Sequence, residues 1–252
     1  MFKNIAKSIQ AYFGALGLIS KLKLWKYFAI PMAISLFTAI VIGLSAYGLS
    51  DNLGFYISKI WVWDWGKETF TTISNVIGGL TIIVLGLILY KHIIMALSAP
   101  FMSPVSEKIE AYLLNIEEHS HRNTSFKEQL WRGIRINLRN LCMELLLTIP
   151  ILLISFIPVI GFLSSIILFL VQAYYAGFGN MDYTLERHFK YAESLRFVRK
   201  NRGVAIGNGI VFMLFLLIPV LGVILVLPFS VTAASKETVS ILKANNHISS
   251  NA

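Results

Sequence analysis

The sequence predicts an all-α integral membrane protein with two full transmembrane helices and two Pro/Gly-broken helical hairpins, which either span the bilayer narrowly or penetrate half of it. The first observation is composition: 56% of the 252 residues are hydrophobic and 14% are charged, whereas soluble domains carry about 25% charged residues. The second is a set of four long uncharged runs, at 28–50, 69–90, 145–181 and 204–235. The third is a motif that interrupts each of the last two runs.

This motif, Ile-Pro-Val-hydrophobic-Gly, occurs at 157–161 and again at 218–222. Proline lacks a backbone N–H and clashes with the preceding turn, and glycine tolerates the backbone angles of a chain reversal. We therefore expect a helix that enters the motif to break there and return. Each arm is then roughly 13–20 residues, or about 20–30 Å, which is at or below the roughly 20 residues of a full span.

The broken hairpins have two open functional interpretations. Interrupted hydrophobic segments that are repeated in a membrane protein point to the substrate path of a transporter. On this interpretation the motif residues Pro158, Gly161, Pro219 and Gly222 are candidate pathway positions. Proline and glycine are also frequent in membrane helices in which they only shape the packing.

The N-terminal segment, 1–27, carries five lysines and no acidic residue. Phe2, Ile5, Ile9 and Phe13 recur at helical spacing, so we expect a basic amphipathic helix that lies on the inner membrane face. A cleaved signal peptide is the competing interpretation. The basic region is too long for one, and the next apolar run exceeds the usual hydrophobic region, so we expect the segment to be retained.

The two uncharged runs that follow are the expected full spans. Residues 28–50 suffice to cross the bilayer with some tilt, and Pro31 is expected in the first turn, where proline is tolerated. The second span covers 69–90 and is closed on its polar side by Lys91 and His92.

The segment after the second span is the largest polar stretch of the chain. The second helix is expected to project beyond the bilayer and to break at Pro100. The stretch 102–144 is expected to be cytoplasmic and amphipathic, and it is too small for a core of its own. Three arginines on one helical face of it favour contact with lipid phosphates over anion conduction; they are Arg132, Arg135 and Arg139. With a polar tail at 236–252, the whole chain, 1–252, reads as a single membrane domain.

The net charge of +9 would suggest nucleic-acid binding in a soluble protein. In a membrane protein the ordinary cause is an excess of Lys and Arg in cytoplasmic loops. We therefore expect membrane lipids and no nucleic acid as partners. All basic stretches lie on the cytoplasmic side of the membrane if the first span runs outward, the second runs back inward, and each hairpin enters and leaves the membrane from the cytoplasm. Both termini are therefore expected in the cytoplasm.

Motifs for catalysis and for metal or cofactor binding are missing. The single cysteine, Cys142, excludes an intramolecular disulfide, and His119 and His121 have no further ligands near them in the sequence. We therefore expect no enzymatic activity, no cofactor and no metal. The uncharged runs also lack an acidic residue, which disfavours an internal proton relay and favours a neutral or anionic solute. Their polar residues are expected to form helix-to-helix hydrogen bonds, Asn180 and Asn208 among them.

Several motifs together are similar to those of one known family. They are Ser98–Phe101 (Ser-Ala-Pro-Phe), Ile157–Gly161, Asp182–Tyr183 and Ile218–Pro228. In this order, after a basic amphipathic start, they resemble the CysZ-type sulfate permeases and their relatives, the etoposide-induced endoplasmic reticulum membrane proteins. The resemblance covers about Ala15 to Thr238 and specifies the fold better than the solute.

The resemblance implies two long transmembrane helices, two pairs of hemi-penetrating helices, a homo-oligomer, and sulfate uptake across the bacterial inner membrane. It also implies a sulfate-binding motif of the Gly-Leu-Arg type before the first span, whose counterpart here is Lys23, Leu24, Trp25 and Lys26. Leu24 matches this motif, Lys23 replaces the glycine and Trp25 replaces the first arginine. Arginine can hold an oxyanion with two hydrogen bonds, whereas lysine acts as a point charge. Thr184 also departs from the family, whose members tend to carry proline there.

Two functions remain open at this point. The first is an inner-membrane anion permease or channel, with sulfate the leading candidate, in which Lys21, Lys23 and Lys26 gather anions and the hairpins line the path. The second is a non-transporting membrane scaffold or partner-binding protein of the same fold, as the eukaryotic relatives suggest. The altered motif at 23–26 favours the second function, and the retained pair of hairpins favours the first.

Overall fold

A computed structural model of the chain describes residues 1–59, 65–116, 124–155, 160–218, 220–245 and 247–248. These residues form nine α-helices and one short 3-10 helix, with no strand among them. The prediction of an all-α membrane protein is confirmed, because four stretches are long and apolar enough to cross a bilayer. They are Trp25–Leu49, Leu85–Leu114, Gly161–His188 and Gly222–Ala244.

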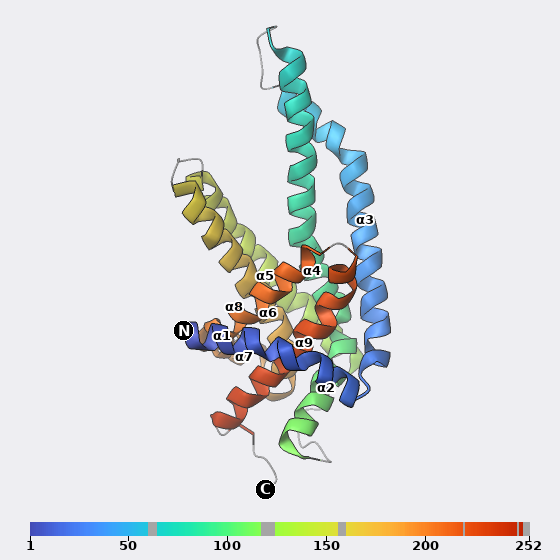
Figure 1. Cartoon of the computed structure of the whole chain (residues 1–252), viewed down its shortest axis with the longest axis vertical. Coiled ribbons are helices and arrows are strands. Elements are labelled where there is room, and N and C mark those ends of the chain that lie inside the picture. The colour runs from blue at the N-terminus through green and yellow to red at the C-terminus, as the bar shows by residue number, and fades with distance from the viewer. Residues whose placement is uncertain (60–64, 117–123, 156–159, 219, 246, 249–252) are drawn as a thin grey trace.

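Three helical hairpins make up most of the fold. The first pairs α3 (Trp25–Ser58) with α4 (Lys67–Leu114), the second pairs α5 (Phe126–Ser155) with α6 (Ile160–His188), and the third pairs α8 (Arg202–Leu216) with α9 (Leu221–Ala244). At 1.5 Å per residue, the 48 residues of α4 extend about 70 Å and the 15 residues of α8 about 22 Å. The α3–α4 hairpin extends farthest toward one end of the molecule, the α5–α6 hairpin points to the same side, and the C-terminal end of α9 lies toward the opposite end (Figure 1).

The two repeated motifs lie where helices end and restart, as expected. One falls between α5 and α6 and the other between α8 and α9. Pro158 and Pro219 themselves lie outside the described residues, whereas Gly161 and Gly222 are each the second residue of the returning helix. A Cβ atom on Gly222 would lie 1.8 Å from the carbonyl oxygen of Phe215. Only glycine therefore allows α9 to return this closely against α8.

The two expectations about proline in the first hairpin are wrong. Helix α4 does not break at Pro100 but continues through it to Leu114. Met95 and Met102, on either side of Pro100, are fully buried, and this packing offsets the roughly 3 kcal/mol that an interior proline costs. Pro31 lies in the second turn of its helix rather than the first, because α3 begins at Trp25.

The helices of the second hairpin extend beyond the uncharged run that predicted them. They contain 30 and 29 residues, whereas the run alone predicted arms of roughly 13–20 residues. Helix α5 begins at Phe126 and α6 continues to His188, so both carry charged side chains at the base of the hairpin. The linker to the third hairpin is a short helix, α7 (Tyr191–Lys200).

The N-terminal segment lies across the base of the hairpins. It consists of α1 (Phe2–Gln10), the 3-10 helix η1 (Ala11–Gly14) and α2 (Ala15–Lys21). Phe2 and Phe13 are 82% and 87% exposed, so the two ends of the predicted apolar face point away from the protein, whereas Ile5 and Ile9 between them are half-buried. The opposite face packs inward: the Ser8 hydroxyl donates a hydrogen bond to the Val204 carbonyl at 3.0 Å. This arrangement suits a helix that rests on a membrane surface.

Helices α6 and α8 cross at small residues in both helices. A Cβ atom on Gly177 would lie 1.8 Å from the Ala205 carbonyl oxygen, and one on Gly209 would lie 1.7 Å from the Ala173 carbonyl oxygen. Ala173 and Gly177 stand four residues apart on α6, as Ala205 and Gly209 do on α8. Small residues at this spacing let two membrane helices approach backbone to backbone. We refer to these four residues as the α6–α8 crossing.

A buried chain of polar groups runs beside this crossing. The Asn180 side-chain amide donates to the Asn208 side chain at 2.9 Å, and the Asn208 amide donates to the Ser230 carbonyl at 2.9 Å. The helix-to-helix hydrogen bond expected of the two asparagines is thus confirmed. The Tyr12 hydroxyl donates to the Asn208 carbonyl at 2.8 Å. Burial raises the pKa of Tyr12 above its ordinary value, which keeps this donor protonated.

Replacing Gly177 or Gly209 by valine is expected to lower the free energy of unfolding by at least about 3 kcal/mol, because each new side chain meets backbone rather than a movable side chain. Thermal unfolding of the detergent-purified protein measures this. Gly48→Val is the matched control, since its Cβ meets no atom within 4 Å. Equal melting temperatures for Gly209→Val and Gly48→Val would contradict the close crossing.

Candidate functional site

The predicted anion motif forms the corner between α2 and α3. Lys23 has a left-handed backbone with φ of 51°. The Leu24 amide donates to the Ile19 carbonyl at 2.9 Å, and the Lys23 amide donates to the Ser20 carbonyl at 3.2 Å. These two bonds and the left-handed residue make a Schellman motif, in which that residue is most often glycine. At the position of the glycine in the Gly-Leu-Arg pattern this chain thus has Lys23, whose backbone adopts the left-handed conformation that glycine usually adopts.

The four predicted motif residues differ in what their side chains do. Leu24 is fully buried in the same apolar cluster as Ile19, so it anchors the corner and is closed to a solute. Trp25 is 41% exposed, and its ring meets that of Phe28 edge to face at 6.2 Å. Lys23 and Lys26 are exposed. The structure therefore leaves the two lysines and part of the tryptophan accessible to a ligand.

Further basic residues gather beside this corner. The ammonium groups of Lys26 and Lys108 lie 5.2 and 5.7 Å from the centre of the Tyr27 ring. Lys21 donates a hydrogen bond to the Tyr112 hydroxyl at 2.6 Å. A cavity of about 500 Å³, lined by Leu22, Lys108, Ala111, Tyr112, Asn115 and Ile116, adjoins these groups. We refer to it as the corner pocket; Lys108 joins it from the far end of α4, a placement that the sequence alone did not indicate.

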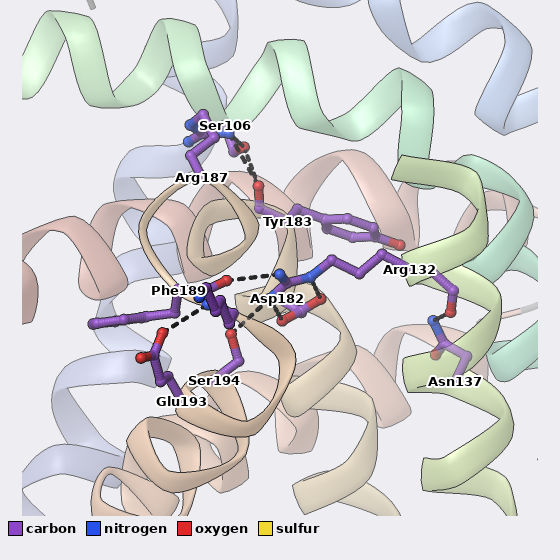
Figure 2. Close-up of polar contacts among 11 residues, drawn as sticks. Ser106, Arg132, Asn137, Asp182, Tyr183, Arg187, Phe189, Glu193 and Ser194 are labelled. Carbon is purple, nitrogen blue, oxygen red and sulfur yellow. Dashed lines mark hydrogen bonds and ion pairs between the residues drawn. The ribbon is translucent and has the colours of Figure 1, made fainter. Parts of the chain in front are cut away.

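A buried ion pair joins α5 to α6 at the base of the second hairpin. Arg132 donates to both carboxylate oxygens of Asp182, at 3.0 and 2.9 Å, and also to the Phe189 carbonyl and the Ser194 hydroxyl (Figure 2). Burial by itself lowers the pKa of Arg132, but the charge of Asp182, the hydrogen bonds to it and the charge of Glu186 together outweigh burial and raise the pKa. Arg132 is therefore a fixed internal cation, and its predicted contact with lipid phosphates is wrong.

A second buried group joins α4 to α6. Arg187 donates to the Glu110 carboxylate at 2.8 Å and to the Ser106 hydroxyl at 2.8 Å. The same carboxylate lies 2.8 Å from His188. Figure 2 shows Arg187 pointing toward Ser106, away from Arg132. Two arginines of the base thus anchor α6 in different directions.

A third buried group joins α4 to α5. Lys91 donates to the Glu144 carboxylate at 2.7 Å, and His92 lies 3.0 Å from the other oxygen of that carboxylate. Lys91 and Glu144 are fully buried, so the basic pair expected at the edge of the second span lies inside the protein. Glu144 precedes the uncharged run by one residue, which is why inspection of the runs alone missed it.

Tyr183, which belongs to the motifs of the family resemblance, and Thr184, where the chain departs from the family, also join helices. The Tyr183 hydroxyl donates to the Met95 carbonyl at 2.7 Å, and the Thr184 hydroxyl bonds to that of Ser235 at 3.1 Å. These contacts hold α6 against α4 and α9. The structure brings them near the buried ion pairs and not to the corner pocket. Among the described residues no group of three His, Cys, Asp or Glu could hold a metal, and His119 and His121 lie outside those residues.

Lys23→Gly is expected to raise the free energy of unfolding by about 1–2 kcal/mol, because glycine adopts the left-handed backbone without the steric cost that a side chain pays. Chemical unfolding in detergent measures the difference. Lys23→Ala removes the same charge and keeps the cost, so it serves as the matched control. If alanine stabilises as much as glycine, the gain comes from charge and not from the backbone.

Arg132→Ala is expected to cost about 3–5 kcal/mol, because it leaves the Asp182 carboxylate buried without its cation. Lys127→Ala removes an exposed charge of the same helix and should change stability by less than about 0.5 kcal/mol. Melting temperatures of the two variants, recorded side by side in detergent, check this. A shift of similar size in both would show that the ion pair contributes little.

The chain is similar to one known protein family over most of its length. The family described as "Sulfate transporter CysZ/Etoposide-induced protein 2.4" matches residues 11–227. No curated protein matches the chain. The family match begins in η1, covers the α2–α3 corner and all three hairpin tips, and ends in α9. This match confirms the resemblance of the motifs, and the chain belongs to the CysZ/etoposide-induced protein family.

Proposed function

We propose that this protein passes a small inorganic anion across the bacterial inner membrane, with sulfate as the first candidate. The family match supports a transport role related to sulfate. The observation that carries the proposal is the cluster of Lys21, Lys26 and Lys108 around the rings of Tyr27 and Tyr112 beside the corner pocket, which Lys108 and Tyr112 line. The protein then acts as a permease rather than an enzyme, without a cofactor.

The charges of the corner pocket differ from those of the protein interior. Lys91, Arg132 and Arg187 each meet a carboxylate. In the part of the chain that the structure describes, none of the three corner lysines forms an ion pair with a carboxylate. Free cations at a cavity mouth attract anions from solution. The corner is therefore where the anion first binds, and the Pro/Gly-broken hairpins line its further path.

The arrangement of the chain supports a cytoplasmic location for this corner. The C-terminal end of α9 lies toward the end of the molecule opposite to the tip of the α3–α4 hairpin, and the N-terminal helix carries lysines without acidic residues. Basic segments remain on the cytoplasmic side of bacterial membranes. The termini and the corner pocket then face the cytoplasm, with copies of the chain associated in the membrane as a homo-oligomer.

A membrane scaffold without transport activity is the second candidate. It is favoured by the burial of Leu24 and by the full use of Arg132 and Arg187 in internal contacts. These residues then serve packing and leave little of the anion motif for a solute. Measuring flux separates the two candidates.

Uptake of radiolabelled sulfate into liposomes that contain the purified protein tests the proposal. Wild-type protein should give saturable uptake, and Lys26→Gln/Lys108→Gln should lower it at least about tenfold, because two of the cations that attract the anion are lost.

Lys59→Gln/Lys67→Gln is the matched control, since it removes two lysines at the opposite ends of the same two helices. It should leave uptake unchanged. Uptake no greater than that of empty liposomes, from folded and reconstituted protein, would sink the transport proposal and favour the scaffold. Equal losses in both double variants would remove the corner pocket from the path.

A further inference from the structure

A second groove, on the side of the molecule away from the corner pocket, lies between the second hairpin and the helices that follow it. Its volume is about 370 Å³. Helices α5, α6, α7 and α8 all contribute to its lining, which consists of Leu147, Ile167, Leu170, Val171, Tyr174, Tyr175, Arg199, Arg202 and Ile206. No residue of the corner or of the buried ion pairs is part of it.

The groove has one basic end and one apolar end. Arg199 and Arg202 are exposed and come from the end of α7 and the start of α8. Within the described residues neither guanidinium pairs with a carboxylate. Tyr174 and Tyr175 line the same groove as both arginines. Two unpaired guanidinium groups beside tyrosine hydroxyls suit a phosphate, which arginine can hold with paired hydrogen bonds.

The apolar end continues onto an exposed hydrophobic face. Leu147 and Ile167, which line the groove, are 39% and 41% exposed. Leu163 and Ile166, the next such residues toward the tip of α6, are also exposed. The hydrocarbon part of a bilayer covers such a face in a membrane protein. The groove thus lies where arginines meet lipid tails, at the level of lipid headgroups.

We propose that this groove binds one anionic phospholipid, with its phosphate at Arg199 and Arg202 and an acyl chain along Leu147 and Ile167. A free inorganic anion would leave the five aliphatic side chains of the lining uncovered. A zwitterionic lipid would bring its own cation against two guanidinium groups. Basic pockets between membrane helices on the cytoplasmic side hold acidic lipid headgroups in this manner. The inference does not depend on the proposed transport function.

Native mass spectrometry of the protein released from vesicles of phosphatidylglycerol and phosphatidylcholine tests this. Wild-type protein should retain phosphatidylglycerol in preference to phosphatidylcholine. Arg199→Gln/Arg202→Gln should retain it at least about tenfold less, since each basic residue near a charged surface contributes about 1 kcal/mol. Arg196→Gln/Lys200→Gln removes two exposed cations of α7 that do not line the groove, and it should behave like the wild type.

Ile206→Trp tests the apolar end, because it fills the groove and keeps both arginines. It should also lose the lipid while its melting temperature in detergent stays near that of the wild type. Equal losses in the two double variants would overturn the proposal in favour of general attraction to an acidic surface. Displacement of the lipid by millimolar inorganic phosphate would reassign the groove to a free anion. If the wild-type protein forms a dimer that carries no lipid, and Ile206→Trp dissociates this dimer, the groove binds a second copy of the chain instead.

Discussion

The backbone contact between α6 and α8 at the α6–α8 crossing sets the position of nearly every other element. Helix α6 carries Asp182 and Arg187, which bind α5 and α4. Helix α8 also packs closely against the N-terminal helix, since a Cβ atom on Gly207 would lie 2.5 Å from the Ile5 carbonyl oxygen. The N-terminal helix is followed by η1 and α2, which lead into the α2–α3 corner. A side chain inserted at the crossing therefore acts far beyond it, on both the base of the hairpins and the corner pocket.

The distribution of charge follows from the low dielectric of the interior. A buried unpaired charge costs several kcal/mol, and Lys91, Arg132 and Arg187 each have a carboxylate within 3 Å. The unpaired cations lie at the surface, in the corner pocket and in the groove of Arg199 and Arg202. The first set joins helices and the second set is available to ligands. Basic residues of one chain thus serve two purposes, and burial rather than residue type separates them.

The fold class and the two hairpin breaks were predictable, because uncharged runs and Pro/Gly motifs act locally. The continuity of α4 through Pro100 was not, because packing of the whole helix against the core decides it. The ion pair of Arg132 with Asp182 joins residues of two different helices. The helical spacing could therefore show only that Arg132 shares a face with two other arginines, and not which residue it binds. In the corner, the motif indicated Lys26 as a candidate ligand for an anion, and the structure leaves its side chain exposed. The local spacing did not show that Lys23 takes the place of a helix-ending glycine, because its backbone angle depends on the burial of the next leucine.

Transport of an anion through this fold is the central claim, and the sign of the charge carried tests it most directly. The purified protein in a planar bilayer, with potassium sulfate at unequal concentrations on the two sides, gives a current whose reversal potential reports the permeant ion. The account predicts a reversal potential with the same sign as the equilibrium potential of sulfate. A reversal potential with the sign set by potassium, or no current from folded protein, would contradict it.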